Sequence, residues 1–212
     1  MGNTPHMPEW ALYALASTVG YLAGSIPFGL VITKAAGLGD IRAIGSGNIG
    51  ATNVLRTGRK DLALATLLLD SLKAGLAALA FTLIAGREAG FVAGAAAFIG
   101  HCYPVWLNFK GGKGIATYAG LLVFVTPLKG LVIAAPIWLG LFALTRISSL
   151  AALAAAAAVP PGTYLMGERN PLILTGLTLL SVFVFWTHRA NLGRLLKGTE
   201  PRFGTSKAKP EE

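Results

Sequence analysis

Long apolar stretches alternate with short polar ones along this chain of 212 residues. A helix that crosses a bilayer needs about 20 mostly apolar residues, and several segments approach or exceed that length while carrying few charges. They are Trp10–Ile32, Leu62–Ala85, Ala89–Phe109, Leu131–Thr145, Leu150–Met166 and Leu172–Trp186. This pattern predicts an all-α membrane protein whose helices cross the bilayer repeatedly.

A further apolar segment, Ile115–Val125, is harder to interpret because it is short and is followed closely by Pro127 and Lys129. It is either a short span that begins inside the preceding glycine-rich segment or a re-entrant segment. The choice decides on which side of the membrane the C-terminus lies. The distribution of basic residues therefore has to decide between the two.

The 18 Lys and Arg residues favour a segment that spans the membrane. With seven spans and the N-terminus outside, 14 of them are cytoplasmic, three (Arg87, Lys129 and Arg169) are outside, and Lys73 lies inside a span. If Ile115–Val125 did not span, the basic C-terminal part would move outside and the bias would largely vanish. Because cytoplasmic loops carry the excess of basic residues, we expect seven transmembrane helices, with the N-terminus outside and the C-terminus cytoplasmic.

Composition agrees with this topology. Charged residues make up 13% of the chain, against about 25% in soluble domains. The net charge of +9 does not indicate nucleic acid, because the basic residues lie in short loops and the tail and are not interleaved with aromatic residues. The single cysteine, Cys102, excludes a disulfide framework or a cysteine-based metal cluster. We expect one transmembrane domain over residues 1–204 and a disordered cytoplasmic tail over residues 205–212.

Candidate chemistry gathers in three polar segments that this topology places on the cytoplasmic side. The first is the long loop Ala35–Lys60, in which Gly45–Arg56 reads Gly-Ser-Gly-Asn-Ile-Gly-Ala-Thr-Asn-Val-Leu-Arg. Glycines allow close approach of the backbone to a ligand, and a guanidinium suits phosphate. A flexible connector is the alternative, although loops of this length are usually functional or disordered. The candidate ligand-binding residues are Gly45, Ser46, Gly47, Asn48, Thr52, Asn53 and Arg56.

The second segment, Phe109–Thr117, leads directly into the short apolar segment. Glycines and lysines at a helix N-terminus make an anion site, because free amides and the positive end of the helix dipole add to the ammonium charges. The segment is not a Walker A loop, since its glycine spacing differs. An ordinary cytoplasmic loop would explain the lysines but not the glycines. The candidates are Lys110, Gly111, Gly112, Lys113, Gly114 and Thr117.

The third segment, Thr187–Glu200, follows the last span. If the helix continues, His188 and Asn191 share one face, and histidine is the usual general acid or base near neutral pH. A basic end that anchors to lipid headgroups is an equally good reading of this segment alone. Arg189 and Glu200 are its other candidate binding residues.

Two ionisable residues, Asp70 and Lys73, lie one turn apart inside the second predicted span. Such residues are costly in a membrane and are functional by default. They are either a neutralised pair that supports the fold or part of a ligand site. For His101, near the inner end of the third span, we expect a structural hydrogen-bonding role.

These three segments, in this order, resemble the signature segments of the bacterial acyl-phosphate glycerol-3-phosphate acyltransferases. The resemblance runs from Gly24–Gly29 (Gly-Ser-Ile-Pro-Phe-Gly) to Glu200, nearly the whole chain. It implies a seven-span enzyme of the bacterial inner membrane whose active site faces the cytoplasm. Such an enzyme transfers an acyl group from acyl-phosphate to the 1-hydroxyl of glycerol 3-phosphate, giving lysophosphatidic acid and phosphate. It implies no cofactor and no metal, and we take a monomer with no nucleic-acid partner as the working state.

In this reading Ser46, Arg56 and Lys113 stabilise phosphate and leaving-group charge, while His188 and Asn191 orient the attacking hydroxyl. The base is either His188 or a phosphate oxygen of the substrate. Covalent catalysis by Ser46 is the weaker alternative, because the segment lacks a nucleophile elbow. A transporter for a phosphorylated metabolite is the rival from another class. Transporters carry ionisable residues near mid-bilayer in several spans, and here only Asp70 and Lys73 do so.

Overall fold

The computed structural model describes residues 7–204, and these residues form helices and loops without a β-strand. The predicted disordered tail, residues 205–212, lies outside the described residues. The ten α-helices of this part of the chain are α1 (Glu9–Gly24), α2 (Phe28–Ala35), α3 (Ala51–Val54), α4 (Lys60–Ala85), α5 (Arg87–Cys102), α6 (Ile115–Val125), α7 (Lys129–Thr145), α8 (Ser148–Leu165), α9 (Pro171–Thr187) and α10 (Arg189–Leu196). Short 3-10 turns cover Ile41–Ala43, Leu55–Thr57 and Val105–Leu107.

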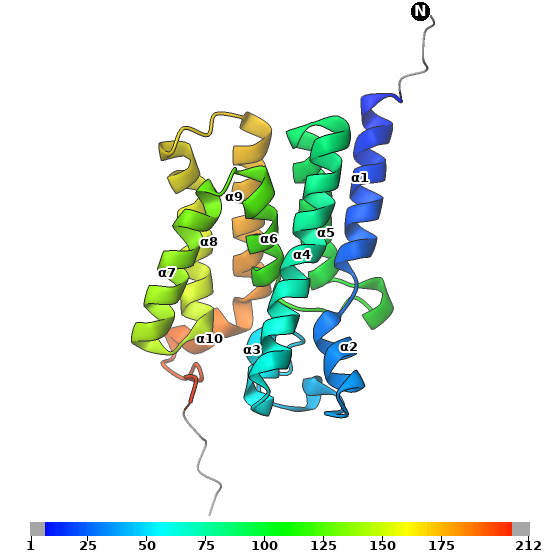
Figure 1. The fold of residues 1–212 in the computed structure, drawn as a ribbon. Helices are drawn as coiled ribbons and strands as arrows, with labels where there is room; N and C mark the ends of the chain where they lie inside the picture. The colour runs from blue at the N-terminus through cyan, green and yellow to red at the C-terminus, as the bar shows by residue number, and fades with distance from the viewer. Residues whose placement is uncertain (1–6, 205–212) are drawn as a thin grey trace, which may run out of the picture.

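The long helices stand side by side in one bundle, and the short helices α2, α3 and α10 lie at its lower end (Figure 1). Helix α1 begins at the upper end, and the described chain leaves α10 at the lower end. Glycines on α1 let it approach α5 closely, because a Cβ at Gly20 would lie 2.1 Å from the carbonyl oxygen of Ala93. A hydrophobic core formed mainly by α5, α6, α8 and α9 packs around Phe98, Leu121 and Leu177.

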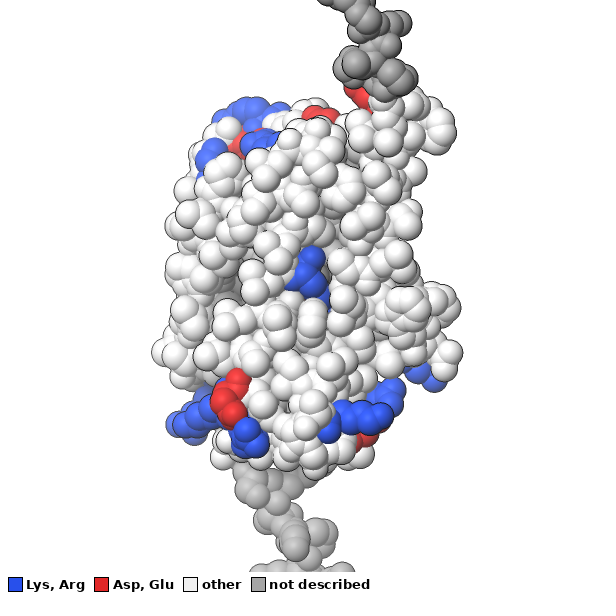
Figure 2. All heavy atoms as spheres, turned by 45° about the vertical axis from the view of Figure 1, so that its right-hand side comes forward, with Lys and Arg blue, Asp and Glu red and all other residues white. Residues whose placement is uncertain are grey.

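The surface of the bundle fits a bilayer. Figure 2 shows charged side chains gathered toward the two ends and a largely uncharged belt between them. By length and composition, three helices can cross a membrane, namely Glu9–Ala35, Lys60–Ala85 and Arg87–Leu107. The bent pair Pro171–Thr187 and Arg189–Leu196, at 64°, makes a fourth if it counts as one span. The described part of the chain is therefore all-helical and apolar enough for a membrane, while the expected seven spans stay a prediction.

Two expected spans differ from the observed helices. The segment expected as one helix from Trp10 to Ile32 is divided into α1 and α2 by a break at residues 25–27, where Pro27 has no N–H to continue the helix. The third expected span, Ala89–Phe109, ends at Cys102, because the residue before Pro104 is driven out of the helical region. The chain then turns back toward the bundle and enters α6 at Ile115.

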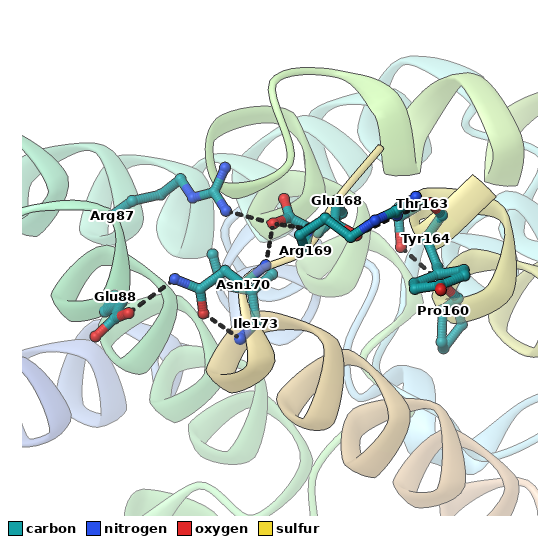
Figure 3. Close-up of polar contacts among 9 residues, drawn as sticks. All are labelled: Arg87, Glu88, Pro160, Thr163, Tyr164, Glu168, Arg169, Asn170 and Ile173. Carbon is teal, nitrogen blue, oxygen red and sulfur yellow. Dashed lines mark hydrogen bonds and ion pairs between the residues drawn. The ribbon is translucent and has the colours of Figure 1, made fainter. Parts of the chain in front are cut away.

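At the upper end of the bundle a group of hydrogen-bonded charged and polar side chains joins α5 to the loop between α8 and α9 (Figure 3). Arg87 donates to Glu168 Oε1 at 2.6 Å, and the same oxygen accepts the N–H groups of Arg169 and Asn170 at 3.0 and 2.9 Å. The amide of Asn170 donates to Glu88 at 2.8 Å. We call these five residues the upper clasp. It ties together two parts of the chain that lie about eighty residues apart.

Candidate active site

The second and third predicted polar segments meet at the side chain of Lys113, and the first lies near it. Its ammonium donates to Asn191 Oδ1 at 2.6 Å, which links the second segment to the third. The hydroxyl of Thr187 donates to the backbone carbonyl of Lys113 at 3.3 Å. The first segment comes close enough for the charge of Arg56 to act on the same ammonium. The structure therefore brings together segments that are separated by most of the chain.

A hydrogen-bonded chain continues outward from Lys113. Asn191 Nδ2 donates to Glu200 Oε1 at 2.5 Å, and this oxygen also accepts the hydroxyl of Ser149 at 2.7 Å. The other oxygen of Glu200 accepts Arg194 Nε at 2.7 Å. Because a carboxylate only accepts and an ammonium only donates, the amide of Asn191 can point in only one direction. Glu200 was expected to bind substrate, but its two oxygens are occupied by protein donors, so in this arrangement it orients Asn191.

Burial and neighbouring charges shift the protonation of this group. Desolvation lowers the pKa of Lys113 to about 8; the charge of Glu200 opposes the shift, and Arg194 and Arg56 add to it. Burial alone would raise the pKa of Glu200, but the hydrogen bonds from Asn191, Ser149 and Arg194 outweigh it and lower the pKa. At pH 7 this is a charged pair around Asn191. The excess positive charge comes from Arg56 and Arg194.

His188 is held at the bend between α9 and α10. Its Nδ1 lies 2.9 Å from the carbonyl oxygen of Val184, which only accepts, so the ring donates from Nδ1. Desolvation and the charge of Lys113 lower the pKa of His188 to about 4. The ring is therefore neutral near pH 7 and carries its lone pair on Nε2. In this state His188 can accept a proton.

The first segment is a loop shaped by the buried side chain of Asn53. The oxygen of this amide accepts the backbone N–H of Ser46 at 3.1 Å and its hydroxyl at 3.3 Å, and its nitrogen donates to the carbonyl of Ile41 at 2.8 Å. All hydrogen bonds of the Asn53 side chain are thus made to the loop itself. The glycines are needed for the backbone, since Gly45 and Gly47 have φ of 57° and 67°.

Within this loop, Ser46 and Arg56 are exposed, and Arg56 packs over Gly45. A Cβ at Gly45 would lie 2.8 Å from Cδ of Arg56. Asn48 accepts the N–H of Gly50 at 2.9 Å and closes a local turn, and Thr52 is half-buried in α3. The guanidinium of Arg56 forms no ion pair with a carboxylate of residues 7–204.

The glycine-rich segment differs from the expectation in one respect. The amides of Gly111 and Gly112 were expected to be free for an anion, but they donate to the carbonyls of Cys102 and His101 at 3.1 and 3.0 Å. A Cβ at Gly111 would lie 2.2 Å from the carbonyl oxygen of His101. These two glycines therefore fasten the loop to the end of α5. Gly114, with φ of 82°, sits against the ring of Phe98 and turns the chain into α6.

Anion-binding capacity remains at the N-terminus of α6, whose first amides have no partner within the helix. Thr117 lies in this first turn, is fully buried, and has a hydroxyl oxygen without a hydrogen-bond partner. Lys113 stands two residues before the first residue of the helix, next to its N-cap Gly114. An anion at this position would meet the dipole, the ammonium and a free hydroxyl.

Two predicted residues point elsewhere. Arg189 stacks on the ring of Trp186 at 4.7 Å and donates to the carbonyl of the same residue. Lys110 is exposed before the glycines. Conversely, no pattern in the sequence singles out Ser149, which lies in the first turn of the apolar helix α8 and outside all three segments. Across residues 7–204, no group of three His, Cys, Asp or Glu side chains could hold a metal ion.

An apolar groove opens beside this network, between α8 and the α9–α10 bend, with a volume of about 600 Å³. Leu150, Leu153, Ala157, Phe185 and Leu192 line it, and Glu200 stands at its edge. A second groove of about 720 Å³ shares Ala157 and Phe185 with the first and extends to Tyr164. Together they form an apolar path from the polar network along α8 and α9.

Comparison with known proteins identifies the family. The family model for glycerol-3-phosphate acyltransferase matches residues 14–198. A glycerol-3-phosphate acyltransferase of Hyphomonas neptunium is 85% identical over 95% of this chain and 97% of its own length. One of Maricaulis maris is 61% identical over 93% and 90%.

A crystal structure of PlsY, an integral membrane glycerol 3-phosphate acyltransferase, in its glycerol 3-phosphate form superposes with a TM-score of 0.84 at 37% identity, over 91% of this chain and 96% of that one. The lysophosphatidic acid form of PlsY gives a TM-score of 0.83 at 36% identity, with the same coverage of both chains. The family resemblance of the three polar segments is therefore confirmed. This chain is a membrane protein that belongs to the glycerol-3-phosphate acyltransferase family.

Proposed function

We propose that this protein transfers an acyl group from acyl-phosphate to the 1-hydroxyl of sn-glycerol 3-phosphate. The products are lysophosphatidic acid and phosphate, and the reaction opens phospholipid synthesis. The observation that carries the proposal is the contact of Lys113 with Asn191, near the charge of Arg56 and the neutral ring of His188, in a membrane protein of this family. Solved relatives described as glycerol 3-phosphate and lysophosphatidic acid forms supply the acceptor and the product.

The proposed donor follows from the charges. Acyl-phosphate and glycerol 3-phosphate both carry phosphate, and Lys113, Arg56 and the N-terminus of α6 offer positive potential for two such groups. The glycines and polar side chains of the first two segments shape this site. The apolar grooves along α8 and α9 suit an acyl chain. An acyl-CoA or acyl carrier protein would need a further surface for its large carrier.

The proposed chemistry is direct transfer. The hydroxyl oxygen of glycerol 3-phosphate attacks the acyl carbon, the new ester C–O bond forms, and the bond from that carbon to the phosphate oxygen breaks. Phosphate leaves with the bonding electrons, held by Lys113 and Arg56. The hydroxyl proton passes to His188 Nε2 or to a phosphate oxygen. Asn191, oriented by Glu200, and Ser46 position the reacting groups.

A covalent route through Ser46 has less support. The hydroxyl of Ser46 lies 3.3 Å from the amide oxygen of Asn53, which is not a base. A serine nucleophile needs an adjacent general base. Direct transfer requires both substrates to be bound together.

We also propose seven spans in the bacterial inner membrane, with the N-terminus outside and this site facing the cytoplasm. The described chain begins and ends at opposite ends of the bundle (Figure 1), which fits an odd number of crossings. A reporter after Glu212 should then be cytoplasmic and one before Met7 external. Both reporters on the same side would contradict this topology.

The deciding experiment uses the purified protein with acyl-phosphate and glycerol 3-phosphate, and follows phosphate release and lysophosphatidic acid. We expect turnover only when both substrates are present, intersecting initial-rate lines, and no acyl adduct on the intact chain by mass spectrometry. Acyl-CoA and acyl carrier protein serve as alternative donors. Turnover with these and not with acyl-phosphate would overturn the donor, and an ester trapped on Ser46 would overturn direct transfer.

A further inference from the structure

Three ionisable side chains lie together in the interior of the bundle, away from the network around Lys113. Asp70 and Lys73 come from α4 and His101 from α5, and their exposed fractions are 2%, 7% and 4%. The Lys73 ammonium lies 2.7 Å from Asp70 Oδ1 and 2.9 Å from His101 Nδ1. Polar groups at such depth in a membrane protein are costly and need an explanation.

The ammonium of Lys73 has used all of its hydrogen-bonding capacity. Its third partner is the carbonyl of Ile26, at 2.8 Å, in the break between α1 and α2. An ammonium has three N–H donors, and here three acceptors receive them. With Lys73 as an ammonium, the group has no donor left for a substrate, and His101 accepts through Nδ1, which also lies 3.5 Å from Asp70 Oδ1. This fixes the plane of the His101 ring.

The fixed ring supports the glycine-rich loop. The carbonyl of His101 accepts the N–H of Gly112 at 3.0 Å, and a Cβ at Gly112 would lie 2.0 Å from His101 Nε2. The loop thus rests on both the backbone and the ring of His101. The next residue is Lys113, on which the proposed site depends. A displacement of the ring is therefore transmitted to this lysine through a single peptide unit.

We propose that His101 is a positioning residue for the acyltransfer reaction, held in place by Lys73 and Asp70, and that it sets the position of Gly112 and Lys113. This inference rests on the proposed function and deepens it. Among the described residues, none of the three side chains is hydrogen-bonded to Lys113, Asn191 or Glu200. They fix the position of the glycine-rich loop relative to the end of α5. A shift of about 1 Å in a group that positions a substrate lowers the rate by up to about a hundredfold.

The first test uses the contact between the ring and Gly112. Gly112→Ala places a methyl group against His101 and should lower kcat/KM by about ten- to a hundredfold. Gly112 has an ordinary negative φ, so alanine is tolerated by the backbone itself. His101→Ala removes the obstacle, and the double variant should recover at least about threefold over Gly112→Ala alone, a non-additivity typical of residues in contact. Losses that multiply in the double variant would overturn the proposal.

The second test removes the anchor of the ring. The double variant Asp70→Leu, Lys73→Met leaves no unpaired charge behind, which is the tolerated way to delete a buried pair. We expect it to melt near the wild-type temperature in detergent and yet to lose about tenfold or more in kcat/KM. Ser71→Ala, next to Asp70 on the same helix, is the matched control and should keep wild-type activity. Wild-type activity of a folded double variant would overturn the role of the pair.

A third readout does not depend on the reaction. The pH dependence of amine acylation at Lys113, followed by mass spectrometry, should have its midpoint near pH 8 in the wild type. It should move to higher pH in the Asp70, Lys73 and His101 variants, because a displaced loop exposes the ammonium to water. Lys110, exposed in the same loop, is the internal reference. If the wild type fails to use acyl-phosphate but this shift is seen, the proposed donor fails while the positioning role holds. An unchanged midpoint in folded variants overturns the positioning role.

Discussion

The two ends of the bundle both carry polar networks, but their charges are balanced differently. In the upper clasp (Figure 3), Arg87 pairs with Glu168, Asn170 donates to Glu88, and the guanidinium of Arg169 donates to the carbonyls of Tyr164 and Glu168. Its two cations and two carboxylates therefore all have protein partners, and their formal charges cancel. Around Lys113, the positive charges of Lys113, Arg56 and Arg194 face the single carboxylate of Glu200. The upper clasp is complete without a ligand, whereas the group around Lys113 has cationic capacity to spare.

From this difference we expect variants of the upper clasp to lose stability and variants of the group around Lys113 to lose activity. A balanced and saturated group can only join helices, so its loss should be seen in the melting temperature. A group with unpaired cations attracts anions, and its loss should be seen in turnover. Variants at the two ends should therefore have opposite signatures, and each of the following predictions tests that separation.

The largest effect is expected at Lys113. Lys113→Ala removes the charge at the N-terminus of α6 and leaves Asn191 without its donor. A charge that stabilises the transition state is worth about a hundred- to a thousandfold in kcat, so activity should fall by at least about a hundredfold. Steady-state kinetics with acyl-phosphate measure the loss, and the melting temperature should change little. A variant that keeps a tenth of the activity would argue against this ammonium as the centre of the site.

Arg56 should come next. Arg56→Ala removes a guanidinium that has no carboxylate partner in residues 7–204, and a charged hydrogen bond is worth about 1.5–3 kcal/mol, so a loss of roughly tenfold or more is expected. Arg59→Ala is the matched control, because Arg59 is already paired with Asp61 at 2.7 Å on the surface. Arg59→Ala should keep most of the activity. Equal losses at the two positions would contradict a specific phosphate contact.

The pH dependence should report the same charge. Burial lowers the pKa of Lys113 to about 8, so the ammonium is present below pH 8 and is lost above it. The value of kcat/KM, which reflects the free enzyme, should therefore be level near pH 7 and fall about tenfold per pH unit above pH 8. Lys113→Arg keeps its charge at all these pH values and should lack this descending limb. A limb that persists unchanged in Lys113→Arg would assign the titration to another group.

Much of the fold could be predicted, because a run of apolar residues indicates a membrane helix without reference to distant parts of the chain. The short segment Ile115–Val125 is a helix with the bounds expected from its sequence, and α4 begins two residues before the expected Leu62. The meeting of Lys113 and Asn191 was predictable as well, because a one-sided topology brings the polar segments to the same end. Family resemblance supplied the substrates, which no pattern of residues specifies.

What could not be predicted depends on contacts between distant segments. Pro27 is visible in the sequence, but prolines are tolerated in membrane helices when neighbours satisfy the freed groups. Here Lys73 does so from another helix, at Ile26. The amides of Gly111 and Gly112 were expected to be free, and only the position of the end of α5 shows that they are not. Ser149 gave no signal at all, because a serine in an apolar helix is common.

Ser149 therefore offers a smaller and sharper test at the lower end. Ser149→Ala removes one of three donors to Glu200, and a neutral hydrogen bond contributes about 0.5–1.5 kcal/mol, which corresponds to a loss of a few-fold to about tenfold in kcat/KM. Ser148→Ala, one residue earlier in the same turn, is the control and should have no effect. The loss should be smaller in an Asn191→Ala background, because Ser149 acts through Glu200 and Asn191. An equal loss in both backgrounds would mean that Ser149 supports the helix and not this network.

The smallest effect on activity is expected at the upper clasp. Arg87→Ala removes the cation from Glu168, but two backbone N–H groups still donate to this carboxylate. The free energy of unfolding should therefore fall by about 1–2 kcal/mol. For a chain of this size, each kcal/mol lowers the melting temperature by about 2–4 °C. Thermal unfolding in detergent should show that loss, while kcat/KM per folded molecule stays within about twofold of wild type, because both cations of the clasp are already held by protein acceptors. Lys129→Ala, which removes a cation without an ion pair in residues 7–204, should leave both quantities unchanged. If Arg87→Ala instead lowered kcat/KM and left the melting temperature intact, the clasp would take part in the reaction. The contrast between the saturated upper clasp and the cationic group around Lys113 would then fail as a guide to where this protein acts.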